Sequence, residues 1–247
     1  VLPFLRFCQN HGLLQLSNRP QWRTVVGGSR VYVDKLLEAM NGVVHCNRAV
    51  SRVKRHEDRV VICDHQEKQQ TFDHVVIATH ADSALALLEK PSNSEKSILG
   101  AFSYQKNNAF LHSDDCLMPI NRRVWSSWNY MGGRQGEGPS VTYWMNRLQS
   151  IDGIPLFVSL NPACKPKLEK QHGIYIYDHP VFTTETQVAQ RQIWSIQGQS
   201  RTWYCGAHLG HGFHEDGLQS GLLVAEQLGG VKRPWQLDNE NYRLSIP

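Results

Sequence analysis

The 247-residue sequence lacks the features that mark several specialised protein classes. Its six cysteines form no Cys-x-x-Cys pair and no dense framework, which excludes a disulfide-rich secreted scaffold and predicts reduced thiols in a cytoplasmic protein. No apolar run approaches the roughly 20 residues needed to span a bilayer. The formal net charge is only +4, with the basic residues scattered, so no nucleic-acid partner is expected.

The sequence also lacks the glycine fingerprint of a complete dinucleotide-binding domain. Such a domain begins with a strand, a Gly-x-Gly-x-x-Gly turn and a helix. The pairs Gly27-Gly28 and Gly132-Gly133 have no third glycine, and the sequence opens at Val1 without an initiator Met. We interpret the chain as a fragment without the first part of a cofactor domain. The alternative is a chain that has lost cofactor binding.

What the sequence contains is typical of a globular α/β protein. Hydrophobic residues make up 40% and charged residues 19%, enough to bury a core in one large domain or two small ones. Apolar residues at helical spacing predict a helix over 31–40, capped by Ser29, and another over 82–89. Strands are predicted at 43–46, 49–53, 60–63 and 72–78. This alternation indicates an α/β fold with a small antiparallel insertion.

The middle of the sequence has a different pattern. Short apolar segments rich in Trp and Tyr alternate with polar turns, and strands are predicted at 101–112, 124–130, 141–145 and 156–160. This pattern indicates a second domain built on an antiparallel or mixed sheet.

The stretch from Trp203 to Gly221 is the most informative part of the sequence. A short apolar strand, 203–205, is followed by four glycines within a dozen residues and then by apolar residues at helical spacing up to Gly229-Gly230. A strand, a glycine turn and a helix allow backbone N–H groups to approach a polar cofactor closely. Asp216, at the start of the helix, can cap it or accept a hydrogen bond from a sugar-like hydroxyl.

Six stretches together resemble the flavin-containing amine oxidoreductase superfamily and, more narrowly, a family of predicted NAD/FAD-binding proteins within it. They are residues 10–14, 19–30, 72–80, 125–130, 141–146 and 206–221. The resemblance implies an α/β fold in which an incomplete FAD/NAD(P)-binding domain of amine-oxidase type carries an inserted mixed or antiparallel-sheet substrate domain. The cofactor domain would comprise 24–90 and 200–232, and the substrate domain 1–23 and 91–199, with 233–247 as a C-terminal tail.

The same resemblance implies FAD as the cofactor and assigns residues to its site. Gly27, Gly28 and Ser29 would turn under the flavin, and Val50 lies in the strand that offers backbone hydrogen bonds to the adenine. The flavin ring and ribityl chain would be held by Gly206, Ala207, Gly212, Glu215 and Asp216. The alternative for Gly27, Gly28 and Ser29 is a tight turn before a helix. The alternative for Val50 is an ordinary strand.

Two further groups of residues are candidates for substrate binding and catalysis. The aromatic block would line an apolar substrate cavity or form a sheet core, and it comprises Trp125, Trp128, Asn129, Tyr130, Tyr143 and Trp144. By resemblance Lys106 is the candidate catalytic lysine, with a solvent-facing strand lysine as the alternative. His112 is a candidate base or part of a turn. The glycines between His208, His211 and His214 interrupt a helical ligand face, so no metal site is expected.

These assignments predict an FAD-dependent oxidoreductase that removes hydride from a C–H bond. The favoured substrate is an apolar acyl or lipid chain, in a desaturase-like reaction. The alternatives are an amine oxidase and a non-catalytic fragment or partner-binding remnant. The expected partner is a small-molecule or lipid substrate, and peripheral contact with a membrane is left open.

Overall fold

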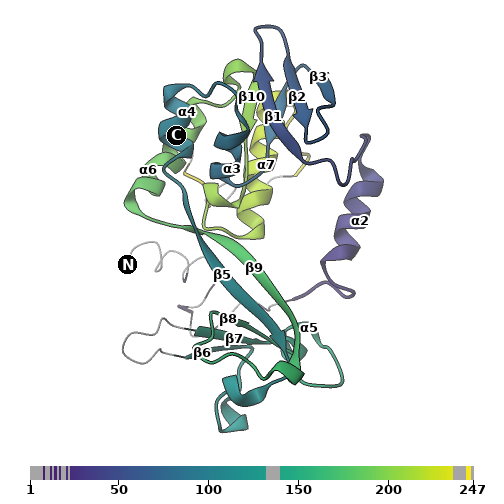
Figure 1. Ribbon diagram of the computed structural model, residues 1–247, viewed down its shortest axis with the longest axis vertical. Helices are drawn as coiled ribbons and strands as arrows, with labels where there is room; N and C mark the ends of the chain where they lie inside the picture. Colours follow the sequence, from purple (N-terminus) through teal and green to yellow (C-terminus); the bar gives the residue numbers. More distant parts are fainter. Residues whose placement is uncertain are drawn as a thin grey trace. The chain divides into compact units, whose positions relative to one another are not determined.

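The computed structural model describes residues 23–131, 140–235 and 243–245, together with residues 8, 12, 14, 15, 17 and 21. The chain divides into two compact units (Figure 1). The first unit comprises Val1–Val44 and Lys106–Asp178, and the second comprises His45–Gln105 and His179–Pro247. Gly132-Gly133 and most of the predicted segment 1–23 lie outside the described residues. The predicted boundaries of a cofactor and a substrate domain stay a prediction.

The second unit contains a pair of short parallel strands. These strands are β4 (Val75–Ile77) and β10 (Thr202–Tyr204), paired in register from Val75 with Thr202 to Ile77 with Tyr204. β4 leads into the helix α3 (Ala81–Leu87), which agrees with the predicted helix over 82–89. β10 leads through the short turn η6 (Ala207–Leu209) into α7 (His214–Gly229). Gly230 ends α7 in the left-handed conformation, with φ 67°, as the glycine pair predicts.

A three-stranded antiparallel sheet forms the predicted insertion. It consists of β1 (Val50–Arg55), β2 (Val60–Asp64) and β3 (Gln69–Phe72), in that order. The carboxylate of Asp64 accepts hydrogen bonds from the backbone N–H groups of Gln66 and Lys68 and so fixes the turn from β2 to β3. The predicted strand at 43–46 is wrong, because these residues are exposed and run into a turn where Asn47 has φ 56°.

The outer edge of β10 is covered by one side chain. Gln197 Oε1 accepts a hydrogen bond from the Tyr204 N–H at 2.8 Å, and Gln197 Nε2 donates one to the Tyr204 carbonyl at 2.7 Å. The Gly198 N–H donates to the Thr202 carbonyl at 2.9 Å. The backbone groups of β10 that point away from β4 are therefore satisfied.

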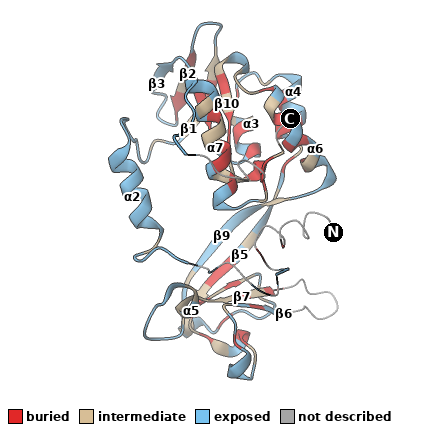
Figure 2. Ribbon diagram, turned by 180° about the vertical axis from the view of Figure 1, so that it is seen from behind, coloured by how far each residue is buried: buried red, intermediate tan, exposed pale blue. Residues whose placement is uncertain are grey.

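Helices surround the parallel pair and complete the core of the second unit. α4 (Asn93–Leu99) and α6 (Thr184–Gln192) both begin with a capping box, formed by Ser92 with Glu95 and by Thr183 with Thr186. The residues of this core are red on the ribbon of Figure 2. They include Val53, Val60, Ile77, Leu99, Ile193, Ile196, Tyr204 and Leu209.

A buried carboxylate joins three elements of this core. Glu95 of α4 is 3% exposed and pairs with Arg55 of β1. Its oxygens also accept hydrogen bonds from the Tyr204 hydroxyl and the Ser92 N–H, both at 2.7 Å. Burial by itself raises the pKa of Glu95, but these donors reverse the effect and lower the pKa to about 2. Glu95 is therefore ionised at neutral pH and holds α4, β1 and β10 together.

The first unit is built on a five-stranded sheet. Its strands follow the order β6 (Trp128–Met131), β7 (Ser140–Trp144), β8 (Phe157–Leu160), β5 (Ser103–His112) and β9 (Gln171–Val181). The pairs β6–β7, β7–β8 and β5–β8 are antiparallel, which agrees with the sheet predicted from the sequence. The short helix α5 (Met145–Gln149) follows β7. Met118, Trp125 and Phe157 form the buried cluster of this unit, with Trp144 packed against it.

The helix α2 (Ser29–Ala39) forms where the sequence predicts a helix, with one difference at its start. Its N-cap is Gly28, with φ 81° and no side-chain cap, so the predicted capping role of Ser29 is wrong and Ser29 is the first helical residue. None of the α2 side chains is buried among the described residues, and α2 is pale blue in Figure 2.

Candidate functional site

The carboxyl ends of β4 and β10 form the most site-like part of the second unit. In parallel sheets, the residues that follow such strand ends are the usual place for ligands. Here Thr79 and His80 follow β4, and Gly206 and Ala207 follow β10. A Cβ atom at Gly206 would lie 3.5 Å from the Thr79 carbonyl oxygen, so the two strand ends are in close contact.

The turn after β10 requires glycine at three positions, and at one of them, Gly210, a Cβ atom would lie 2.6 Å from the buried Asp216 carboxyl group. Gly206 has φ 154°, and a Cβ atom there would lie 2.8 Å from the His208 ring. Gly212 has φ 89° and donates its N–H to the Ala207 carbonyl at 3.0 Å. Ser220 Oγ accepts the Gly206 N–H at 3.0 Å and so ties the turn to α7. Exposed backbone at Gly212 can approach a ligand without a side chain in between.

The first turn of α7 is open to solvent. Phe213, His214 and Glu215 are exposed, and the helix has 16 residues, so its N-terminal N–H groups carry the positive end of a full helix dipole. The Glu215 carboxylate accepts a hydrogen bond from Gln219 Nε2 at 2.9 Å. Among the predicted site residues, Gly206, Ala207, Gly212, Glu215 and Asp216 are brought together here.

Asp216 differs from its neighbours because its side chain is fully buried. The carboxylate accepts the Phe213 N–H at 2.8 Å, which caps α7, and pairs with the Nε of Arg243 at 2.7 Å. Arg243 belongs to the C-terminal tail, where Leu244 enters the core and the Ser245 carbonyl accepts from Trp194 Nε1 at 2.9 Å. Asp216 therefore anchors both the helix start and the tail, a contact that the sequence reasoning did not find.

His208 is one of the three histidines of the glycine turn, for which the sequence leaves open a flavin contact or an ordinary loop position, and it is buried beside Gly206. Its ring packs edge-on against Phe102, with ring centres 5.0 Å apart. Burial lowers the pKa of His208 to about 4, with a smaller contribution from nearby His80, so the ring is neutral at pH 7. Its Nε2 atom is buried without a hydrogen-bond partner among the described residues, as is Oε1 of Gln219 in α7. Buried polar atoms of this kind normally have partners.

A stacked pair lies at the end of β4. His80 and Tyr104 have ring centres 4.3 Å apart and nearly parallel planes, 14° from each other. The Tyr104 hydroxyl accepts the Ala81 N–H at 2.8 Å, and burial raises the pKa of Tyr104 to about 12. An exposed imidazole is thus held flat at the strand end by a neutral phenol.

The remaining predicted cofactor residues belong to other elements of the chain. Val50 is half-buried at the start of β1 in the second unit, where the β1–β2 register shifts. Gly27 and Gly28 have φ 85° and 81° and belong, with Ser29, to the first unit. Lys106 is exposed on β5. Their roles toward a flavin stay predictions.

The aromatic block separates into a core pair and an outer pair. Trp125 and Trp144 pack edge-on, with ring centres 5.4 Å apart, within the buried cluster of the first unit. Trp128 and Tyr143 form a second edge-on pair at 6.2 Å. Of the remaining two members of the block, Tyr130 is exposed and Asn129 is buried.

Asn129 bonds to the protein backbone. It accepts the Ser126 N–H and donates to the carbonyl oxygens of Ser126 and Thr142. The amide therefore holds the turn before β6. A role in a substrate cavity stays a prediction for the whole block.

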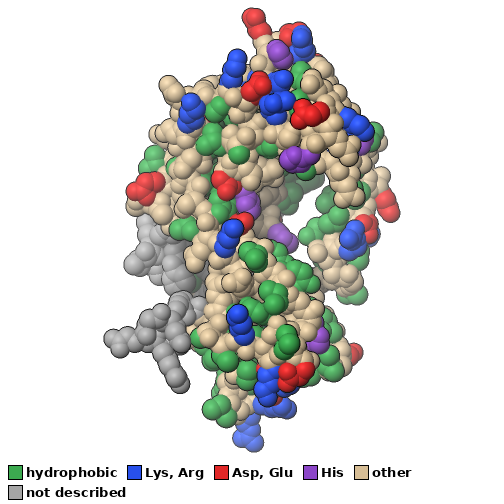
Figure 3. Space-filling view, in the orientation of Figure 1, with side chains coloured by type: hydrophobic (Ala, Val, Ile, Leu, Met, Phe, Trp, Pro, Cys, Tyr) green, Lys and Arg blue, Asp and Glu red, His purple; other side chains and the backbone are tan. Residues whose placement is uncertain are grey.

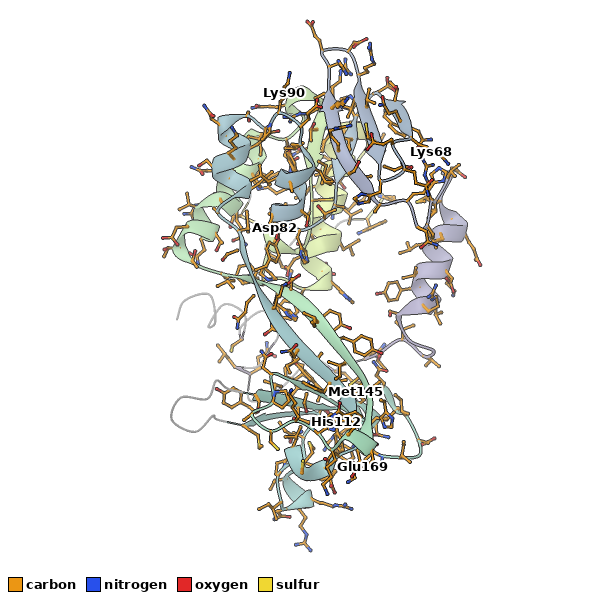
Figure 4. The ribbon with its side chains drawn as sticks, in the orientation of Figure 1. Lys68, Asp82, Lys90, His112, Met145 and Glu169 are labelled. Carbon is orange, nitrogen blue, oxygen red and sulfur yellow. The ribbon has the colours of Figure 1, made fainter. Side chains whose placement is uncertain are left out.

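His112 is held inside the sheet of the first unit (Figure 4). Its Nδ1 accepts the Asp114 N–H at 3.1 Å, so the proton is on Nε2, which donates to Ser159 Oγ at 2.8 Å. Burial lowers the pKa of His112. Because its basic nitrogen is occupied by a backbone N–H, His112 is structural in this arrangement. In the described part of the chain, no group of three or more His, Cys, Asp or Glu residues is placed to hold a metal ion.

The comparison of sequences with known families gives one match. Residues 3–115 match the family described as flavin containing amine oxidoreductase. No curated protein matches the sequence significantly. In the described residues, no helix is long and apolar enough to cross a membrane.

Solved structures share the fold. A CLA-producing fatty acid isomerase from P. acnes is 12% identical, with a TM-score of 0.58 over 81% of this chain and 52% of that chain. A candidate protoporphyrinogen oxidase from Exiguobacterium sp. 255-15 is 11% identical, with a TM-score of 0.62 over 92% and 57%. A putrescine oxidase with redesigned cofactor binding is 12% identical, with a TM-score of 0.58 over 83% and 54%.

The chain therefore spans about half the length of the solved structures that it matches. It has the mixed α/β fold of the FAD-dependent amine oxidases and protoporphyrinogen oxidases, present in part. The predicted resemblance to the superfamily is confirmed, and the narrower family stays a prediction.

Proposed function

We propose that this chain, which has the fold of the flavin-containing amine oxidoreductases, forms part of the flavin site of an FAD-dependent oxidoreductase that removes hydride from a C–H bond. The observation that supports this proposal is the junction of β4, β10 and α7. Two parallel strands end side by side there, a glycine turn follows, and the N-terminus of a long helix is exposed.

The residues at this junction fit a flavin. Gly212 leaves the backbone exposed, Gly206 lets the turn pack closely against the end of β4, and the exposed start of α7 offers N–H groups to an electron-rich ring. His208 Nε2 and Gln219 Oε1 are buried polar atoms that still need partners. FAD would accept the hydride, and this chain would orient the ring and favour its anionic reduced form through the helix dipole.

For the substrate, we favour an apolar acyl or lipid chain. The fold is shared with a protein described as a fatty acid isomerase, and Trp128, Tyr130 and Tyr143 of the first unit leave part of their aromatic surface exposed. An amine oxidase is the second candidate, since the fold is shared with a putrescine oxidase as well.

Glu215 tests the cofactor site, because its side chain is exposed and contributes little to the fold. In the complete flavin-loaded protein, Glu215→Gln is expected to weaken flavin binding by about 1.5–3 kcal/mol, the usual loss of a charged hydrogen-bond partner. Flavin titration followed by fluorescence measures the dissociation constant. Glu185→Gln, at an exposed position in the first turn of α6, is the matched control and should leave flavin affinity unchanged. An unchanged affinity in Glu215→Gln would remove this residue from the site.

Lys106 distinguishes the two substrate classes. If Lys106 assists the reaction of reduced flavin with oxygen, Lys106→Met should slow reoxidation at least tenfold, about 1.4 kcal/mol in barrier, without slowing flavin reduction. Stopped-flow absorbance separates the two half-reactions. That result favours the oxidase, whereas unchanged rates in both half-reactions favour the lipid reaction. Failure of the complete protein to bind any flavin would favour the non-catalytic, partner-binding alternative.

A further inference from the structure

The first unit presents an exposed surface with an unusual mixture of side chains. It is made of residues 115–124 and 165–170, which we call the basic tip. Ile120 is fully exposed, Leu168 is 82% exposed and Val124 is 58% exposed. Each of these side chains leaves apolar surface in water that burial against another apolar surface would stabilise.

Hydrogen bonds hold the two segments of the basic tip together. The buried carboxylate of Asp114 accepts the Lys167 N–H at 2.9 Å and the Cys116 N–H at 3.3 Å. The Ser113 N–H donates to the Lys170 carbonyl at 2.9 Å. These bonds keep the pKa of Asp114 at about 2, against the upward effect of its burial, so the clamp is ionised at any physiological pH. Ile120 and Leu168 are therefore exposed on segments joined by one clamp.

The basic tip carries more positive than negative charge. Five of its side chains are basic, and they are Arg122, Arg123, Lys165, Lys167 and Lys170. Two of these are near carboxylates, with Arg122 3.1 Å from Asp115 and Lys170 3.5 Å from Asp114. The exposed side chains of Arg123, Lys165 and Lys167 outnumber the one remaining carboxylate, Glu169, which is labelled in Figure 4. Figure 3 shows Lys and Arg beside hydrophobic side chains at the lower end of the view.

We infer that the basic tip docks on an anionic lipid surface. Aliphatic side chains that project fully into solvent can enter the boundary between headgroups and acyl chains, and the surrounding Lys and Arg then meet the anionic headgroups. A nucleic acid would use the basic residues but would leave Ile120 and Leu168 in water. An acidic protein is the competing occupant, and a surface that served only such a protein would not bind vesicles. The inference does not depend on the proposed flavin chemistry.

Vesicle sedimentation tests the docking surface. The complete chain should sediment with vesicles of phosphatidylcholine and phosphatidylglycerol about tenfold more strongly than with phosphatidylcholine alone, and added salt should reduce this binding. Ile120→Asp and Leu168→Asp should each weaken binding about tenfold, because an inserted aliphatic side chain is replaced by a charge that the lipid repels. Ile120→Trp should bind as well as the original protein, since Trp is favoured at membrane interfaces.

The matched control is Ile154→Asp, at an isoleucine of the first unit outside the basic tip that is 60% exposed. It should bind anionic vesicles as the original protein does. Charge reversal at Arg123 and Lys165 should remove the preference for anionic vesicles. The inference is overturned if the original protein sediments with neither vesicle, or if Ile120→Asp, Leu168→Asp and Ile154→Asp all bind equally well.

Discussion

Replacing Glu95 with Ala should lower the free energy of unfolding by about 3–5 kcal/mol, because it leaves Arg55 buried without its counter-charge. The Tyr204 hydroxyl and the Ser92 N–H lose their acceptor in the same step. Urea denaturation followed by circular dichroism measures this loss. The expected value is a large part of the stability of an ordinary domain.

The Glu95 carboxylate also makes the stability of the fold depend on pH. The pKa of Glu95 is about 2 in the folded chain, below its ordinary value of 4.5. Its stabilising contribution is therefore complete above the unfolded pKa and is lost as the pH falls from about 4.5 towards 2. The Glu95→Ala protein should show a smaller fall in stability across this window than the original protein.

Glu89→Gln is the matched control for Glu95. Glu89 is exposed and lies 3.8 and 3.9 Å from Arg52 and Lys54, so its removal should change stability by less than about 1 kcal/mol. If the two substitutions lowered the free energy of unfolding equally, the buried Glu95 network would contribute no more to stability than an exposed ion pair. Tyr204→Phe should have an intermediate effect of about 1.5–3 kcal/mol, since it removes one hydrogen bond to a charged group.

Replacing Asp216 with Asn should destabilise the second unit by about 3–5 kcal/mol, because the substitution breaks the buried ion pair with Arg243. Loss of this pair should also release the C-terminal tail, and hydrogen exchange at Leu244 and Ser245 should rise. Denaturant unfolding and hydrogen exchange measured by mass spectrometry provide the two readings.

Glu215→Gln distinguishes effects on the stability of the fold from effects on flavin binding at the start of α7. Glu215 is the exposed neighbour of Asp216, and its replacement should cost at most about 0.2–0.5 kcal/mol of stability, because the hydrogen bond from Gln219 loses only its charged acceptor. If Asp216→Asn were as mild as Glu215→Gln, the Arg243 pair would not be holding the tail. In the double variant Asp216→Asn with Arg243→Gln, the loss should be smaller than the sum of the single losses.

Local patterns in the sequence predict the elements that carry local signals. Helix α7 follows a glycine turn and ends at Gly230, and both signals are visible in the sequence. Helix α4 was missed although Ser92 and Glu95 have the spacing of a capping box. Strand β9 was also missed, because Gly173 and Pro180 interrupt its apolar alternation and the strand forms by pairing with distant residues.

At the candidate site, local sequence patterns predict the glycine turn but not the long-range contacts. Glycine at 206 and 212 follows from the spacing of a strand, a turn and a helix, and the structure has both in left-handed or related conformations. The partner of Asp216 is 27 residues away in a different segment, so no local pattern links the two side chains. The same holds for His208, whose Nε2 is buried without a partner in the described part of the chain and whose ring packs against Phe102, just before β5.

Gln197 blocks one edge of the two-stranded parallel sheet, so a further strand can pair only at the opposite edge. Its side-chain amide imitates a neighbouring strand at Tyr204, donating to the carbonyl and accepting from the N–H as a strand residue would. The Ile77 carbonyl accepts from Cys205, so in a parallel ladder the N–H and carbonyl of Val76 point away from β10. A strand edge with such groups is a template for pairing. Of the two described strands, β4 is thus the one that can recruit a further strand, and Gln197 terminates the sheet on the other side.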